Sequence, residues 1–232
     1  IDADNILKPL NVLVVGDSRL DLFPQLKEYA EEIPGKHGET HFGSNLGSRP
    51  LELHIASMDG MTPEEKEEFK RLCARYLNPV GGSKPLVFWD DLDKTYNVKY
   101  AGKIDPEQYA DWLEFTIPFK MTSSYIEGSF KKAYVGTGTI TNAGNTETPL
   151  VIEITGEITN PEVTIGDITL GYTGTIPAGK TLVIDTEKLT AELDGENVLD
   201  DLTGDITVML QPGETTVTAD SNVTFIWRER WV

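Results

Sequence analysis

The chain has 232 residues, a formal net charge of −18 and 39% hydrophobic residues. This apolar content is enough for a packed core, which excludes a disordered chain, and no window approaches the roughly 18 consecutive apolar residues of a membrane span. Because so acidic a protein repels phosphate groups, we expect neither nucleic acid nor a membrane surface as a direct partner.

The first predicted strand lies in NVLVVGDSRLDLF, residues 11–23, and runs into a Gly-Asp-Ser turn of the kind that holds the nucleophile in one class of esterases. A nucleophilic Ser18 would need a histidine base and a carboxylate that orients it. The histidines are His37, His41 and His54, and none has an acidic residue three positions before it, where such esterases place it. We therefore expect no catalysis and assign Ser18 to a turn.

The next segment, LDLFPQLKEYAEEI at residues 20–33, leaves two structures open. Its apolar residues fit one face of a helix, but so short a pattern also fits a β-arm; they are Leu22, Leu26, Tyr29 and Ile33. A Gly-rich stretch follows at residues 34–48 and is longer than a compact domain needs. Two of its histidines are four residues apart, which would suit a metal on a helix. The surrounding glycines disfavour a helix, so we expect loop histidines without a metal.

The clearest helix signal is MTPEEKEEFKRLCARYLNP, residues 61–79. Thr62 can cap this helix, Pro63 suits its first position, and Glu65 completes a capping box. Its apolar residues have the spacing of one buried face, formed by Phe69, Leu72, Cys73, Tyr76 and Leu77. Because Cys73 is the only cysteine, the chain has no internal disulfide and no cysteine-based zinc site.

Three strands rich in β-branched and aromatic residues are predicted after the helix, in KPLVFWDD, KTYNVKYAGKI and DWLEFTIPF. Turns are predicted between them at Asp90-Asp91 and Asp105-Pro106. With the helix they predict an α+β domain with an antiparallel sheet, which we place at residues 1–122.

From residue 123 the chain is almost entirely short β runs, separated roughly every 8–12 residues by turn residues, as in a sandwich. We therefore predict a second, all-β domain at residues 123–232, and a mainly β protein with one clear helix. The runs are AYVGTGTITN, PLVIEITGEI, DITLGYTG, KTLVIDT, DITVML, ETTVTA and NVTFIWRERWV. The acidic stretch ELDGENVLDDLTGD lacks the ligand spacing of a calcium loop, so we expect solvated turn acids there.

The closing WRERW alternates in a strand. It would send Trp227, Glu229 and Trp231 to one face and the two arginines, Arg228 and Arg230, to the other. We expect the tryptophans to be buried in the second domain; an aromatic patch that binds a partner is the alternative.

Segments along nearly the whole chain, taken in order, resemble one known family. In the first half they are EEIPGKHGETHFGSNLGSRPLELHI, the capped helix, KPLVFWDDLDKTYNVKYAG and DWLEFTIPFKMTSS. In the second half they are ITNAGNTETPLVIEITG, AGKTLVIDTEKLTAELDGENVL, LQPGETTVT and VTFIWRERWV. The chain is similar to the distal tail (Dit) family of long-tailed, non-contractile bacteriophages. PFKMTSSY replaces the Asp-Pro-Tyr-like sequence that the family commonly has at the hinge.

The resemblance implies a structural protein that is not an enzyme and needs no cofactor or metal. Members of the family form a homo-hexameric ring at the far end of the tail tube. Their N-terminal domains close the ring, and their galectin-like or jelly-roll β-sandwiches project outward. The implied partners are other copies of the chain, the tail tube protein, the tail tip or tail-associated protein and, in some phages, receptor-binding proteins. The implied location is the tail tip of the virion, after synthesis in the host bacterial cytoplasm.

A ring closed by head-to-tail contacts needs two different complementary surfaces on each subunit. We expect the Gly-rich stretch to reach a neighbouring subunit or the tube, and basic residues to pair with acids across the interface; a surface loop without a partner is the alternative. The expected interface residues are Pro34, Gly35, Lys36, His37, Gly38, His41, Phe42, Arg49, Arg228 and Arg230.

A carbohydrate-binding module that contacts the host cell wall is the alternative function, because galectin-like sandwiches bind sugars. Residues 123–232 leave no room for an inserted sugar-binding domain, and they contain few aromatic residues outside the final strand. We therefore expect the structural role.

Overall fold

The computed structural model covers the whole chain and describes all residues except 1–11, 18–23, 58–59, 104–106 and 109–112. Ser18 and the expected Asp105-Pro106 turn lie outside the described residues. The chain divides into two compact units, residues 1–126 with Val232, and residues 127–231. This division lies a few residues beyond the domain boundary proposed from the sequence.

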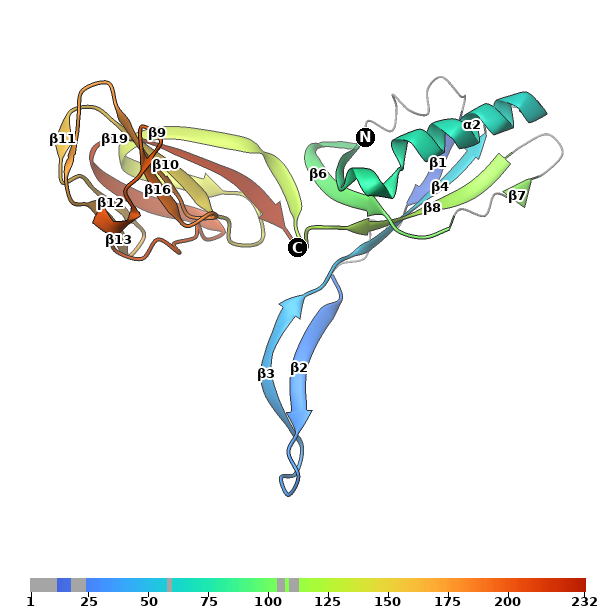
Figure 1. Ribbon diagram of the computed structural model, residues 1–232, viewed down its shortest axis with the longest axis horizontal. Coiled ribbons are helices and arrows are strands. Elements are labelled where there is room, and N and C mark those ends of the chain that lie inside the picture. Colours follow the sequence, from blue (N-terminus) through green and yellow to red (C-terminus); the bar gives the residue numbers. More distant parts are fainter. Residues whose placement is uncertain (1–11, 18–23, 58–59, 104–106, 109–112) are drawn as a thin grey trace. The chain divides into compact units, whose positions relative to one another are not determined.

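The first unit is built on one antiparallel sheet in the order β1-β4-β8-β6-β5 (Figure 1). A short strand, β7, pairs with the first residues of β8, while β6 pairs with its last residues. The bounds are β1 (Val12–Asp17), β4 (Pro50–Ser57), β5 (Lys84–Phe88), β6 (Asp91–Tyr100), β7 (Glu107–Gln108) and β8 (Leu113–Met121). The three strands expected after the helix are confirmed as β5, β6 and β8.

Strands β4 and β8 of this sheet each have one buried face and one more exposed face, because successive side chains of a strand point to opposite sides. On β4 and β8 the core face carries Leu51, Leu53, Ile55, Phe115, Ile117 and Phe119, all buried. The register places Leu53 directly opposite Ile117. The other face is polar, and there the His54 Nδ1 and Thr116 Oγ1 atoms lie 2.8 Å apart.

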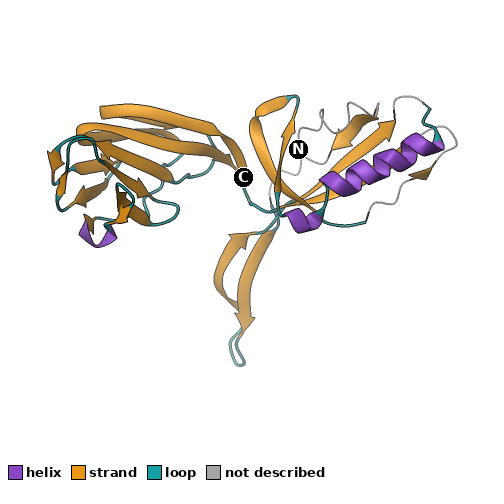
Figure 2. Ribbon diagram, turned by 45° about the horizontal axis from the view of Figure 1, so that its top comes forward, coloured by secondary structure: helices purple, strands orange, loops and turns teal. Residues whose placement is uncertain are grey.

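The predicted helix is present as α2 (Pro63–Tyr76), followed by a 3-10 turn at Pro79–Gly81 (Figure 2). Its capping box is confirmed: the Thr62 N–H donates to Glu65 Oε2 at 2.8 Å, and the Glu65 N–H donates to Thr62 Oγ1 at 3.2 Å. Phe69 is buried, and its ring lies 5.1 Å from the ring of Phe115, centroid to centroid. The helix therefore packs on the core face of the sheet.

Two further strands, β2 (Leu26–Glu32) and β3 (Glu39–Leu46), form a two-stranded antiparallel sheet of their own (Figure 1). For the described part of residues 20–33, the β-arm is therefore correct and the helix is wrong. The expected loop at residues 34–48 is also corrected, since only its first residues form a turn and most of the rest is strand. The glycines of this stretch suggested a loop, but pairing with β2 supplies the backbone hydrogen bonds that make most of it a strand.

The second unit is antiparallel β-structure, and the all-β expectation is confirmed. Its longer strands are β9 (Ile126–Asn142), β10 (Leu150–Thr155), β12 (Glu162–Ile165), β13 (Ile168–Tyr172), β15 (Thr181–Asp185), β16 (Thr190–Leu193) and β19 (Gly213–Trp231). Shorter ones are β11 (Ile158–Thr159), β14 (Thr175–Ile176), β17 (Glu196–Asn197) and β18 (Leu202–Thr203), and a 3-10 turn lies at Leu199–Asp201.

Strand β19 belongs to two sets of strands in this unit. Its residues 217–219 pair with β12, which continues to β13 and β18, whereas residues 223–227 pair with β10, which continues to β15, β16 and β17. The other neighbour of β19 is β9. ETTVTA and NVTFIWRERWV, expected as two strands, are thus parts of one strand.

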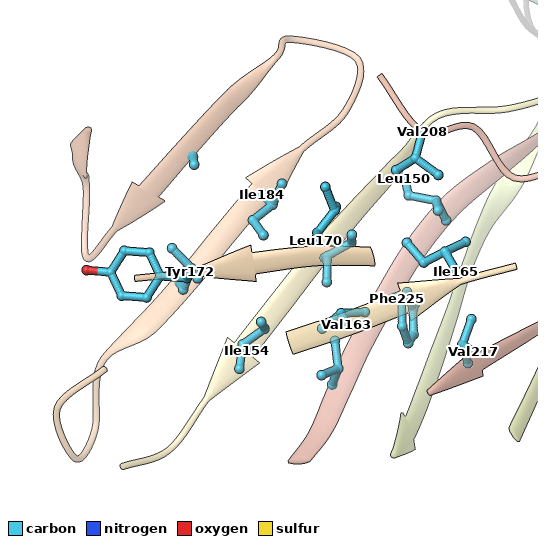
Figure 3. Packing of buried hydrophobic residues seen from close by; sticks show 14 of the residues in the cluster. Leu150, Ile154, Val163, Ile165, Leu170, Tyr172, Ile184, Val208, Val217 and Phe225 are labelled. Carbon is cyan, nitrogen blue, oxygen red and sulfur yellow. The ribbon is translucent and has the colours of Figure 1, made fainter. Parts of the chain in front are cut away.

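Side chains from both sets of strands meet in one core, where Phe225 of β19 is fully buried (Figure 3). Leu150 and Ile154 come from β10, and Val163 and Ile165 come from β12. The expected strand DITVML is wrong, since this segment forms a turn and a single bridge between Leu210 and Thr148. Its alternating apolar residues nevertheless enter the core, because Val208 and Leu210 are both buried.

The turn after β15 depends on one carboxylate, that of Asp185. Its Oδ1 accepts the N–H groups of Glu187 and Lys188, each at 3.0 Å, and its Oδ2 accepts the Lys188 ammonium at 2.7 Å. Burial alone raises the pKa of Asp185, but these hydrogen bonds, led by that of the Lys188 side chain, outweigh burial and hold the pKa below its ordinary value.

A group with a lowered folded-state pKa stabilises the protein above its unfolded pKa, and this stabilisation is lost as the pH falls through the folded pKa. We expect Asp185→Asn to lower the free energy of unfolding at pH 7 by about 1–2 kcal/mol. The difference from the wild type should shrink as the pH falls below about 4. Urea unfolding across this pH range measures both effects, with the exposed Asp167→Asn as the control. An equal loss at every pH would contradict the role of the charge.

Candidate assembly surface

The β2–β3 hairpin exposes more large apolar side chains than its own two strands can cover. Every residue of β2 is exposed, and Leu26, Tyr29, Ile33 and Phe42 are 44–65% exposed. A two-stranded hairpin without a hydrophobic layer beneath it is marginally stable at best in water. Exposed apolar groups gathered in one place are typical of surfaces that contact other proteins. The hairpin is therefore the candidate assembly surface of the first unit.

The turn that joins the two strands contains five of the expected interface residues, 34–38, and all five are exposed. Gly35 and Gly38 have φ angles of 88° and 81°, which favour glycine in this tight turn. The Lys36 ammonium donates to Thr40 Oγ1 at 2.9 Å. The expected residues of the tip thus lie where a partner could reach them, although Lys36 already has a contact within the hairpin.

A β-bulge interrupts the hairpin near its middle. Tyr29 pairs with Gly43 and Ala30 pairs with His41, so Phe42 is the extra residue on β3. His41 and Phe42 are both exposed, as an interface role requires. Because a bulge increases the local twist of a strand pair, this part of the hairpin presents its aromatic residues on a strongly twisted ribbon.

The base of the hairpin is held by close backbone contacts. The Gly47 N–H donates to the Gln25 carbonyl oxygen at 2.6 Å, and a Cβ at residue 47 would lie only 2.7 Å from that oxygen. The Ser124 hydroxyl lies 3.2 Å from the carbonyl oxygens of both Leu46 and Gly47. Gly47 is therefore required by a close approach and not by an unusual φ angle.

Arg49 lies just after this base and is only 3% exposed. Its side chain is thus buried within the single chain, and its pairing with acids across an interface stays a prediction. Its carbonyl oxygen accepts the N–H of Met121 at 2.8 Å, and this bond joins the start of β4 to the end of β8. The position of Arg49 indicates a role in the interior of the first unit.

The two arginines of the closing strand also form ion pairs with carboxylates of their own unit. Arg228 forms an ion pair with Glu127 at 2.9 Å and lies over the Phe130 ring, 4.6 Å from its centroid. Arg230 contacts Glu187 and lies 4.0 Å from Glu127. Because these charges are already compensated, the structure gives no support for Arg228 and Arg230 as interface cations.

The expected burial of the closing tryptophans is confirmed for Trp227, and Glu229 on the same face is buried as well. Trp231 is half-buried, and its ring lies so close to Gly128 that a Cβ there would be 2.9 Å from Trp231 Cζ3. The aromatic patch proposed as the alternative is thus not formed by Trp227.

Sequence reasoning missed several exposed rings and apolar groups. Trp89 and Leu92 are exposed at the turn between β5 and β6, and Phe130 and Tyr134 of β9 are each 70% exposed. The expectation that the second domain has few aromatic residues outside its final strand was therefore misleading about its surface. The even-numbered spacing of Phe130 and Tyr134 in a strand was the signal, since it places both on one face.

Among the described residues, no group of three or more His, Cys, Asp or Glu could hold a metal ion. In the acidic stretch at residues 192–205, Asp194 contacts Lys180, and Asp205 accepts the side-chain and backbone groups of Thr207. The hydrogen bond from the Thr207 hydroxyl, followed by that from its N–H, lowers the pKa of Asp205. Nor does any helix in the described ranges combine the length and apolar character needed to cross a membrane.

Two family models match the chain. One is described as a phage tail protein RIFT-related domain and matches residues 7–121; the other is a siphovirus-type tail component, C-terminal domain, and matches residues 143–231. No curated protein matches the chain.

Among solved structures, the Dit protein of phage SPP1 has a TM-score of 0.77 and 17% sequence identity, over 96% of this chain and 94% of that chain. That protein is described as a paradigm of the hub adsorption apparatus in phages that infect Gram-positive bacteria. The phage P2 baseplate in its calcium-activated conformation has a TM-score of only 0.41, with 9% identity over 94% of this chain and 90% of that chain.

The close approach at the hairpin base is testable. We expect Gly47→Ala to lower the free energy of unfolding by about 1–3 kcal/mol, because the new methyl group cannot fit beside the Gln25 carbonyl oxygen without moving the base. Hydrogen exchange of the β2 and β3 amides should also become faster. Urea unfolding and hydrogen exchange measure these effects, and Gly81→Ala, where a Cβ meets no atom closer than 3.9 Å, is the control. Unchanged exchange in the hairpin would show that the base tolerates the methyl group.

Proposed function

Since the chain belongs to the distal tail (Dit) family of siphovirus tail components, we propose that it forms a hexameric ring between the tail tube and the tail tip. As a member of this family it is a structural protein of the phage tail hub or baseplate, and not an enzyme. It is accordingly a component of the tail in the virion.

The observation that carries the ring proposal is the exposure of the β2–β3 hairpin. A closed ring of identical subunits needs head-to-tail contacts, in which one surface of each subunit fits a different surface of the next. A ribbon with exposed Tyr29, Ile33 and Phe42, held firmly at its base, is suited to be one of these two surfaces. The contact would bury side chains that water otherwise surrounds, which favours association.

The ring would use its two faces for different partners. We propose that one face contacts the tail tube protein and the other contacts the tail tip or tail-associated protein. The second unit, with its own hydrophobic core, would be the module that lies outside the ring. In phages that attach receptor-binding proteins to this domain, it would hold them. The Dit protein of SPP1, described as a hub, supports this arrangement through a shared fold.

The hairpin contribution can be tested by polar substitution. We expect Tyr29→Ser combined with Phe42→Ser to weaken self-association at least tenfold, or about 1.4 kcal/mol, because both rings lose their apolar contacts. Light scattering over a range of protein concentrations measures the mass of the oligomer. Leu199→Ser, an exposed apolar residue of the second unit, is the matched control. A double variant with the mass of the wild type would argue against the hairpin as a ring contact.

Carbohydrate binding remains the second candidate, because Phe130 and Tyr134 are exposed on one face of β9, about 13 Å apart along the strand. Sugar rings stack on such side chains, although the Arg228 guanidinium already covers one face of the Phe130 ring.

If the protein has only a structural role, we expect that the wild type does not sediment with purified cell wall of the host. Phe130→Ala and Tyr134→Ala should then change nothing in this assay, since there is no bound sugar to lose. Sedimentation of the wild type that both substitutions abolish would support the carbohydrate function instead. Thr224→Ala, a partly exposed residue of β19, is the control for changes unrelated to the rings.

A further inference from the structure

One face of the β2–β3 hairpin concentrates carboxylates that form no ion pair with the described residues of the chain. Glu32 lies directly opposite Glu39 in the register of the two strands. Glu28 is on the same face of β2 as Glu32, because side chains alternate along a strand. These residues are exposed, and none of them forms an ion pair with another described residue. Like charges directly opposite each other in a sheet are destabilising, so this face is unfavourable in the isolated chain.

The sheet of the first unit contains the opposite arrangement. Lys99 of β6 lies directly opposite Lys120 of β8, and both are exposed. Their neighbours Val98 and Phe119 are buried on the core face, so the two lysines lie on the face of the sheet opposite α2. Within the described part of the chain neither lysine has an ion-pair partner. This pair of cations is therefore also unfavourable by itself.

We infer that the Glu32–Glu39 pair of one copy docks on the Lys99–Lys120 pair of a neighbouring copy. The inference rests on the ring proposed above and names the two surfaces that meet in it. Each pair consists of residues directly opposite on adjacent antiparallel strands, so the Cβ atoms within each pair are about 4.5–5.5 Å apart. Two carboxylates and two ammonium groups with the same spacing can form two ion pairs at once.

A second copy of the chain is the occupant that the charges favour. Glu32 lies six residues along β2 from Leu26, about 20 Å beyond the base of the hairpin. The acidic pair is therefore presented far along the ribbon. The lysine of the adjoining turn, Lys36, donates to Thr40 and forms no ion pair with either carboxylate. Because the acidic and basic surfaces are different parts of one unit, their contact is head-to-tail, which is the kind that closes a ring.

Several other basic residues are poorer partners for an incoming acid because they already contact carboxylates of their own unit. Lys131 and Lys132 of β9 lie 3.7 and 3.6 Å from Glu229 and Glu153. Lys70 of α2 contacts Glu67 at 2.7 Å, and this contact lowers the pKa of that carboxyl group. An incoming carboxylate would have to displace these partners, whereas Lys99 and Lys120 form no ion pair with a described residue that it would have to displace.

Charge reversal separates the two surfaces. The hairpin-reversed variant carries Glu32→Lys and Glu39→Lys, and the sheet-reversed variant carries Lys99→Glu and Lys120→Glu. We expect each variant alone to self-associate at least tenfold more weakly than the wild type, because like charges then meet at every contact. A one-to-one mixture should recover the mass of the wild-type oligomer, since each hairpin then meets a sheet of opposite charge. Light scattering at low salt is the measurement, and rising salt should weaken wild-type association.

Glu196→Lys is the matched control, because Glu196 is an exposed glutamate of β17 in the second unit and belongs to neither of the two proposed surfaces. It should leave the mass unchanged, and urea unfolding should show that all the variants fold. Reversed variants that keep the wild-type mass, or a mixture that does not recover it, would overturn the inference. If polar substitution at Tyr29 and Phe42 weakens association while charge reversal does not, the result would support the ring and contradict the proposed contact between the acidic and basic pairs. A wild type that is monomeric at every concentration would contradict the ring itself.

Discussion

A ribbon of two strands has no interior, and this constraint governs the assembly surface of the protein. The β2–β3 hairpin satisfies its backbone hydrogen bonds between its own strands, but it has no layer against which its side chains can pack. Its order depends on the base, where Gly47 approaches Gln25 and Ser124 lies beside the same turn of chain. Exposed aromatic rings and opposed carboxylates add no stability in water, so a partner that covers them would supply stabilisation that the hairpin itself lacks.

The two units bury their apolar side chains in different ways, and they differ in the surfaces that they leave exposed. In the first, one face of a sheet is covered by α2 through Phe69 and Phe115, and the other face remains polar and open to contacts. In the second, two sets of strands enclose a core around Phe225, and charged side chains such as Arg228 are compensated within the unit. The first unit thus presents pairs of like charges on its hairpin and sheet, whereas the lysines and arginines of the second unit contact carboxylates of that same unit.

The features predicted correctly from the sequence are those decided by neighbours in the chain. The capping box joins Thr62 to Glu65 three residues away, and the burial of Trp227 follows from alternation within one strand. The partners of Arg228 and the burial of Arg49 could not be predicted, because both depend on segments far apart in the sequence. The helix and strand alternatives for β2 were undecided, since a pattern of only four apolar residues is too short to separate them until β3 is paired beside it.

The placement of β19 has a consequence for the order in which the units form during synthesis. All the described strands of the first unit lie within residues 12–121, so its sheet can assemble while later residues are still being translated. In the second unit β19 lies between β9 and β10, although it follows both by many residues. Contacts between such distant segments form slowly. The second unit therefore stays an incomplete sheet, with an open edge on β10, until its last strand has left the ribosome.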